Sequence, residues 1–430
     1  MLLDELFRNA KNPDEPFLAW RGGNLSLARV AGEKAALDGV NSGDVVALVG
    51  DFDAESLAAL FLLLDRGAII MPLTEETRSQ HDYFFTAGLA DCVWEHGAVR
   101  QLRKTPARHP LLGALREKGH AGLILFSSGS TGLPKAILHD FTRFLARYRT
   151  PRPALRTLNF LLFDHIGGLN TLFHTLFNNG LIIRPTNRTP SDIVSDIANH
   201  GVELLPATPT FLRMLLLSGV LREIAMPSLR LVTYGTERMD EPTLQAIAAA
   251  LPAVGIRQTY GMSELGILRI KTKARDQLWI QVGGEGVTTA IRGGELFIHA
   301  TNRMEGYLNA PSPFTDDGWY PTGDMVDSDG EWLRITGRKD DIINVGGLKV
   351  LPALVERAAL EFPGVCFAKA QGAANPLTGS HVELAVQPEE GREMNLVALK
   401  AHLRSALPPH VVPRRVVVAE VAVGHRFKKL

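Results

Sequence analysis

The stretch Phe126-Ser-Ser-Gly-Ser-Thr-Gly-Leu-Pro-Lys135 is the most informative part of this sequence. It follows the apolar run Gly122-Leu-Ile-Leu-Phe126, which predicts a buried strand. Glycine lets a loop bring its backbone amides close to an anion, while hydroxyl groups and a lysine add donors and positive charge. A solvated Ser/Gly turn would explain part of this stretch but not all of it. We therefore predict a phosphate-binding loop with contacts from Ser127, Ser128, Gly129, Ser130, Thr131, Gly132 and Lys135.

A P-loop kinase or ATPase is one competing interpretation of such a loop. In a Walker A motif the last glycine is followed directly by Lys and then Ser or Thr. Here Leu133 and Pro134 separate Gly132 from Lys135, so the spacing argues against that class of enzyme.

Length and composition indicate a globular protein with more than one domain. The chain has 430 residues, beyond the usual size of one core. Lys plus Arg and Asp plus Glu are both 46, so the net charge gives no support for nucleic-acid binding. The two cysteines, Cys92 and Cys366, form no metal-ligand pattern. We find no signal peptide and no run long enough to span a membrane, and we expect a cytoplasmic protein.

Two further motifs follow downstream. In Gln258-Thr-Tyr-Gly-Met-Ser-Glu264 an aromatic face suits a purine, a hydroxyl suits a phosphate oxygen and a carboxylate suits Mg²⁺. In Asp317-Gly-Trp-Tyr-Pro-Thr-Gly-Asp324 a carboxylate ends a glycine-containing turn, where it could accept hydrogen bonds from both hydroxyls of a ribose.

These motifs, in this order, closely resemble those of the adenylate-forming superfamily, which includes acyl-CoA and aryl-CoA synthetases, luciferases and the adenylation domains of peptide synthetases. The resemblance covers essentially the whole chain. It implies an α/β fold with a large multi-sheet N-terminal adenylation domain, residues 1–338, and a small mobile α+β C-terminal domain, residues 339–430. Alternating strand and helix patterns before residue 110 agree with parallel α/β architecture.

The resemblance also assigns roles within the nucleotide site. Tyr260 would stack on adenine, Ser263 would contact phosphate, and Glu264 would hold Mg²⁺. Gly261, between Tyr260 and Ser263, would belong to the same nucleotide site. Asp324 would bind the ribose. The turn Gly235-Thr-Glu237 would lie along adenine and the acyl tunnel, but Thr236 stands where the family has Gly or Ala, which leaves the pocket shape open.

The run Gly337-Arg-Lys-Asp-Asp-Ile-Ile-Asn-Val-Gly-Gly-Leu-Lys349 resembles the interdomain linker of the superfamily. Arg338 would reach the nucleotide, Asp340 would be the hinge, and Gly346 with Gly347 would line the tunnel for the thiol. Lys349 stands where Arg is common and would keep the charge without a bidentate phosphate contact.

Two candidates concern the carboxylic acid. His165, in Leu161-Leu-Phe-Asp-His-Ile-Gly-Gly168, would be a satisfied core histidine without further context. The resemblance makes it a gate of the carboxylate pocket, although Phe163-Asp164 also imitates the pair that holds the ammonium group in amino-acid-activating domains. At the C-terminus, Lys428 is the candidate for the family's catalytic lysine and Lys429 is the alternative, or both belong to a solvated tail, because no Gly precedes Lys here.

The sequence thus predicts an acid–thiol ligase that uses ATP and Mg²⁺ to form an acyl-AMP and then transfers the acyl group to CoA. A fatty or simple aromatic acid is the expected substrate. One alternative is a stand-alone adenylation enzyme that loads the phosphopantetheine of an acyl or peptidyl carrier protein. Another is a catalytically weak nucleotide-binding protein.

Overall fold

The computed structural model describes residues 2–32, 37–127, 132–424 and 426–428. The first sheet has the strand order β13-β12-β11-β9-β10-β1-β2, and all its pairs are parallel except the β1–β2 hairpin. The sequence pattern of residues 16–27 predicts this hairpin. The strands are β1 (Pro16–Trp20), β2 (Gly23–Ser26), β9 (Arg156–Leu158), β10 (Leu181–Ile183), β11 (Leu204–Ala207), β12 (Leu231–Tyr234) and β13 (Gly255–Gln258).

The second sheet contains the strand that precedes the predicted phosphate loop. Its order is β19-β8-β7-β4-β3-β5-β6, with a parallel centre, β7-β4-β3-β5. Every residue of β3, β4 and β7 is buried, as is typical of parallel sheets covered on both faces. The strands are β3 (Val45–Val49), β4 (Ile69–Leu73), β5 (Cys92–Glu95), β6 (Ala98–Gln101), β7 (Gly122–Phe126), β8 (Ala136–Asp140) and β19 (Gly306–Tyr307).

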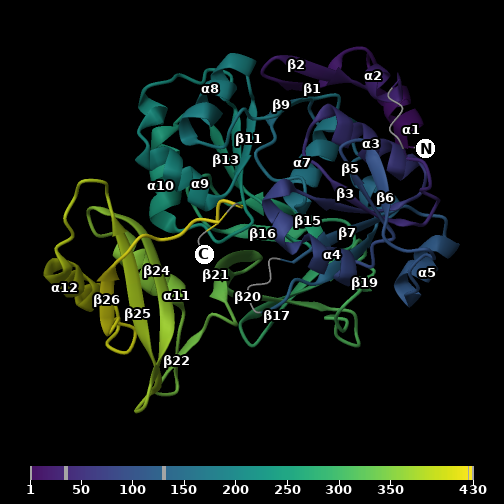
Figure 1. Ribbon diagram of the computed structural model, residues 1–430. Helices are drawn as coiled ribbons and strands as arrows, with labels where there is room; N and C mark the ends of the chain where they lie inside the picture. Colours follow the sequence, from purple (N-terminus) through teal and green to yellow (C-terminus); the bar gives the residue numbers. More distant parts are fainter. Residues whose placement is uncertain (1, 33–36, 128–131, 425, 429–430) are drawn as a thin grey trace.

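Helices join and cover these two sheets (Figure 1). One apolar core takes Leu18 from the first sheet, Leu48 from the second, and Phe61 and Phe173 from the helices α3 and α7. The helices are α1 (Leu2–Asn9), α2 (Leu27–Gly32), α3 (Ala54–Asp65), α4 (His81–Ala87), α5 (Pro110–Glu117), α6 (Phe141–Ala146), α7 (Ile166–Phe177), α8 (Pro190–His200), α9 (Pro209–Leu217) and α10 (Glu241–Ala250), with short 3₁₀ helices η1 (Glu75–Gln80) and η2 (Val220–Arg222).

The third sheet is antiparallel along its paired strands and carries most of the downstream motifs. Its order is β14-β15-β16-β21-β20-β18-β17. The strands are β14 (Tyr260–Met262), β15 (Gly266–Thr272), β16 (Ile280–Gly283), β17 (Val287–Arg292), β18 (Glu295–Ala300), β20 (Tyr320–Asp329) and β21 (Trp332–Arg338).

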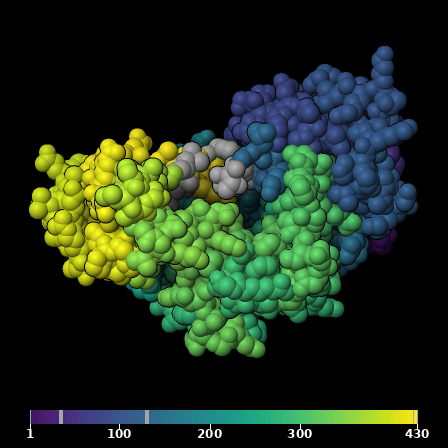
Figure 2. All heavy atoms as spheres, turned by 90° about the horizontal axis from the view of Figure 1, so that it is seen from below, coloured from purple at the N-terminus to yellow at the C-terminus, as the bar shows by residue number. Residues whose placement is uncertain are grey.

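A small sheet with its own core ends the chain. Its strands are β22 (Ile343–Val345), β23 (Leu348–Val350), β24 (Val365–Asn375), β25 (Gly379–Pro388) and β26 (Arg415–Val418), with helices α11 (Pro352–Leu360) and α12 (Leu396–Ala406). Its apolar cluster is drawn from residues 343–416. Figure 2 shows this C-terminal part, in yellow, at the opposite side of the molecule from the N-terminal part in blue.

The α/β multi-sheet fold predicted from the sequence is confirmed. Two details differ or stay open. The sequence pattern of the segment His139–Arg149 predicts a helix, but its first two residues belong to β8, because strand pairing with β7 continues to Asp140. The division of the chain at residue 338 stays a prediction, although β21 ends at that residue and the small sheet has a separate core.

Candidate active site

The two ends of the predicted phosphate loop are tied together. Ser127 N donates to Lys135 O at 3.1 Å, and Lys135 N donates to Ser127 Oγ at 2.9 Å. Asn309, after β19, reinforces the loop: its Oδ1 accepts from Ala136 N at 2.8 Å and its Nδ2 donates to Pro134 O at 3.2 Å. Ser128, Gly129, Ser130 and Thr131 lie outside the described residues. Hydrogen bonds to each other and to Asn309 therefore hold the two ends of the loop together.

Lys135 and Glu264 meet at the ring of Tyr307. Lys135 Nζ lies 5.1 Å from the ring centroid, and the Tyr307 hydroxyl donates to Glu264 Oε1 at 2.8 Å. The Glu264 side chain is buried. Lys135, the predicted phosphate contact, and Glu264, the predicted Mg²⁺ ligand, thus contact the same aromatic residue, whose role the sequence did not reveal.

The turn after Tyr260 is fixed by contacts with the neighbouring strands β8 and β15. His139 on β8 is buried, and burial lowers its pKa to about 4, so the ring is neutral and its Nε2 donates to Ser263 O at 2.6 Å. Gly261 packs against the backbone of Gly266, and a Cβ at residue 261 would overlap the Gly266 carbonyl oxygen. The His139 contact fixes the Tyr260–Glu264 turn against the second sheet, and the Gly261 contact packs it against β15 of its own sheet.

Tyr260, Asp324 and Arg338 form one cluster. The Tyr260 hydroxyl donates to Asp324 Oδ2 at 2.6 Å, and Arg338 Nη1 lies 3.1 Å from Asp324 Oδ1. Burial raises the pKa of Asp324, and the Arg338 guanidinium opposes that effect. Tyr260 and Arg338 therefore both contact the carboxylate of Asp324, and the sequence assigned all three residues to nucleotide binding.

The turn after β12 has an unusual backbone. A Cβ at Gly235 would overlap Thr259 Oγ1, so glycine allows the β12 and β13 ends to approach. Thr236 has φ of 72°, where a β-branched residue is rare, and its Oγ1 is buried with no hydrogen-bond partner among the described residues. Glu237 Oε1 accepts from Thr210 N at 2.7 Å and so joins this turn to α9.

His165 begins α7 as its N-cap. Its Nδ1 accepts from Gly167 N at 3.1 Å, which leaves the proton on Nε2 when the ring is neutral. Burial, together with the charges of Lys428 and Arg426, holds the pKa of His165 well below its usual value. The predicted gate is thus a neutral hydrogen-bond donor.

The C-terminal segment enters the same site. Arg426 Nη2 lies 3.1 Å from Oδ2 of the buried Asp164. Lys428 lies close enough to His165 to oppose its protonation and close enough to Glu237 for their charges to attract. Burial lowers the pKa of Lys428 to about 8, with Arg426 contributing. Lys429 lies outside the described residues. The structure thus places Lys428 near His165, the residue predicted to gate the carboxylate pocket.

The predicted hinge and thiol residues lie elsewhere. Asp340 is exposed between β21 and β22, and Gly346 and Gly347 form the exposed β22–β23 turn, with Gly346 N donating to Thr378 O at 2.9 Å. Lys349 on β23 is also exposed. In this conformation these residues belong to the surface of the small sheet.

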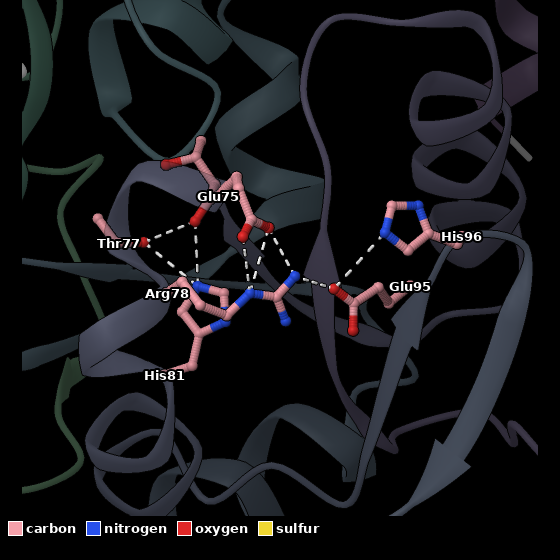
Figure 3. A network of polar contacts seen from close by, with 7 residues as sticks. Glu75, Thr77, Arg78, His81, Glu95 and His96 are labelled. Carbon is pink, nitrogen blue, oxygen red and sulfur yellow. Dashed lines mark hydrogen bonds and ion pairs between the residues drawn. The ribbon is translucent and has the colours of Figure 1, made fainter.

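A cavity of about 350 Å³ lies beside the C-terminal segment, with Phe427 in its wall. Its polar lining includes Asn159, Arg184 and Arg188, and Asn159 Oδ1 is buried with no partner among the described residues. Glu76 on η1 also lines it. Figure 3 shows how η1 is held: Arg78 lies between the carboxylates of Glu75 and Glu95.

The donors present suit a magnesium ion that is bound mainly by phosphates. In the part of the chain that the structure describes, no group of three or more His, Cys, Asp or Glu side chains could hold a metal ion. Mg²⁺ commonly uses one or two protein carboxylates together with substrate phosphates, and Glu264 offers one with Oε1 already oriented. No helix among the described residues has the length and apolar character needed to cross a membrane.

Comparison with known proteins shows the family of this chain. The AMP-binding enzyme family matches residues 93–308, and the chain belongs to it, within the adenylate-forming superfamily. The sulfoacetate–CoA ligase of Cupriavidus necator is 28% identical over 76% of this chain and 69% of that protein. The fatty acid–[acyl-carrier-protein] ligase MmaC of Mycobacterium marinum is 29% identical over 65% of this chain and 59% of that protein.

Solved structures show the same fold. ATP-bound MatB from Rhodopseudomonas palustris superposes with a TM-score of 0.80 at 22% identity, covering 99% of this chain and 96% of that chain. The alignments cover 69% of the length of the sulfoacetate ligase and 59% of the length of MmaC.

Proposed function

We propose that this protein activates a carboxylic acid with ATP and transfers the resulting acyl group to the thiol of CoA. One observation supports this more than any other. Lys428 lies near His165, while Tyr260, Asp324 and Arg338 form a cluster close enough for Arg338 to act electrostatically on Lys428. Adenylation requires a cation beside the carboxylate of the acid and a binding site for AMP.

In the first step a carboxylate oxygen of the acid attacks the α-phosphorus of ATP. The bond between the α-phosphorus and the bridging oxygen breaks, and pyrophosphate leaves with both electrons of that bond. Lys428 stabilises the charge that develops on the reacting groups, and the His165 Nε2 proton orients the carboxylate. Lys135 and the loop amides hold the phosphates, and Mg²⁺ bound at Glu264 would supply further charge neutralisation.

In the second step a thiol attacks the acyl carbon and AMP leaves. We propose that the small C-terminal domain, residues 339–430, turns about Asp340, which withdraws Lys428 and brings the Gly346–Gly347 turn to the acyl-AMP. The surface position of that turn in the present conformation is consistent with such a movement.

The cavity beside Phe427 suggests the size of the acid. We infer that it holds the non-reacting end, and its volume of about 350 Å³ favours a simple aromatic or short acid over a long alkyl chain. The guanidinium groups of Arg184 and Arg188 offer partners for a hydroxyl or a second acidic group. The sulfoacetate ligase among the relatives acts, by its name, on an acid of this kind.

A carrier protein is the second candidate acceptor, because the relative MmaC is named for one. Thioester formation should be measured with CoA and with a phosphopantetheinylated carrier protein in parallel, after the acid has been found by pyrophosphate exchange. AMP formation with CoA alone supports the first acceptor. ATP binding without acid-dependent turnover would instead identify a catalytically weak nucleotide-binding protein.

A further inference from the structure

Arg426 and Asp164 form a largely buried ion pair between the C-terminal segment and the loop before α7. The two residues are 262 positions apart in sequence, and Nη2 and Oδ2 are 3.1 Å apart. Only 4% of the Asp164 side chain and 17% of the Arg426 side chain are exposed. Removing one partner of such a pair leaves an uncompensated charge, so the contact strongly favours the docked position of the segment.

Phe427 provides a second contact of a different kind. Its ring centroid lies 4.9 Å from that of Phe160 and 5.6 Å from that of Phe211. Its carbonyl oxygen accepts from Thr208 Oγ1 at 2.7 Å. The φ of Phe427 is 52°, a left-handed conformation that glycine adopts readily and a bulky residue seldom does. The aromatic packing therefore offsets a backbone cost at the residue directly before Lys428.

Both contacts restrict the chain immediately before the amino group of Lys428. Gly424 N also donates to Lys428 O at 2.9 Å, and Phe427 N donates to Gly424 O at 2.8 Å, which closes the segment into a tight turn. The side chain of Lys428 thereby lies near His165 and Glu237.

We propose that Arg426 and Phe427, here called the tail anchor, are positioning residues that place Lys428 in the site for adenylation and leave it for thioester formation. The inference rests on the proposed function, in which Lys428 acts in the first step alone. In the proposed function neither anchor residue acts on the reacting carboxylate or phosphate, and Phe427 lines only the cavity for the non-reacting end of the acid. Their loss affects the first step because Lys428 is no longer held in place.

The first test separates the two half-reactions. Asp164→Asn and Phe427→Gly should each slow pyrophosphate exchange by about tenfold or more. Acyl transfer to CoA from supplied acyl-AMP should be unchanged, since the tail has left the site in that step. Arg426→Gln makes the same test at a site within the tail if Asp164→Asn does not fold. Arg415→Gln, which removes an exposed pair with Glu383, is the control.

The second test needs no substrate. The pH dependence of carbamylation of Lys428 by cyanate, followed by mass spectrometry, should give a pKa of about 8 in the wild type and the Arg415→Gln control. In the anchor variants that pKa should move toward the ordinary value of a solvated lysine, because the side chain is no longer buried. The same pKa in all proteins would overturn the anchor, as would equal loss of both half-reactions. If the wild type shows no exchange with any acid, the proposed function fails, while the cyanate result still decides whether the anchor exists.

Discussion

Burial and the nearby guanidinium of Arg426 lower the pKa of Lys428 to about 8. Burial and the positive charges of Lys428 and Arg426 lower the pKa of His165, so that its ring is neutral. The site thus contains a lysine that is charged at neutral pH and a histidine that is not. A charged amino group can stabilise developing negative charge, and a neutral imidazole can donate its proton in a hydrogen bond. Each side chain acquires its role from its surroundings.

Lys428→Ala should reduce pyrophosphate exchange by about 100-fold or more, because a preorganised charge is lost where charge develops. Transfer of the acyl group from supplied acyl-AMP to CoA should continue at the wild-type rate. Lys104→Ala, at an exposed lysine, is the matched control. Equal loss in both half-reactions would argue against a first-step role.

The rate of exchange should also depend on pH. Lys428 is protonated below its pKa of about 8 and neutral above it, so the rate should hold below pH 8 and then fall by about tenfold per pH unit. Lys428→Arg keeps its charge and should move this decline to much higher pH. A decline at the same pH in both proteins would assign it to another group.

At the scale of single elements, the β7–β8 hairpin shows what could be predicted. The apolar run before Phe126 specified a buried strand, and Gly and Ser residues specified the loop, because both signals are local. The clamp by Asn309 could not be foreseen, since it depends on β19 pairing with β8. The helix expected from His139 starts two residues late for the same reason: pairing with β7 determines where β8 ends.

Asn309→Ala should loosen the base of the phosphate loop. It removes hydrogen bonds to Ala136 N and Pro134 O, each worth about 1 kcal/mol. We expect the KM for ATP to rise by about fivefold or more, with the KM for the acid unchanged. Asn302→Ala, at an exposed residue before β19, should leave both constants alone. A change in the acid constant alone would contradict the assignment of the loop.

On the scale of the whole molecule, the site joins segments that lie far apart in sequence. The motif residues Tyr260, Glu264 and Asp324 could be found from the sequence, because each has a residue type matched to one part of a nucleotide. The ion pair of Asp164 with Arg426 could not, because no local signal relates residues separated by 262 positions. The left-handed φ of Phe427 was equally hidden, since the usual signal for that conformation is glycine.

The hinge at Asp340 can be tested by stiffening it. Asp340→Pro fixes φ and should preserve pyrophosphate exchange while reducing thioester formation by about tenfold or more. Asp340→Ala keeps the backbone free and should lose far less. Equal impairment of both half-reactions by proline would count against a rotation about this residue.

Acid-dependent exchange of labelled pyrophosphate into ATP, measured across aromatic, short and dicarboxylic, fatty and amino acids, tests the central claim most directly. We predict exchange with one class of compact acid, and AMP with pyrophosphate as the products once CoA is added. ATP binding without stimulation by any acid, or cleavage of ATP to ADP, would contradict adenylation by this site.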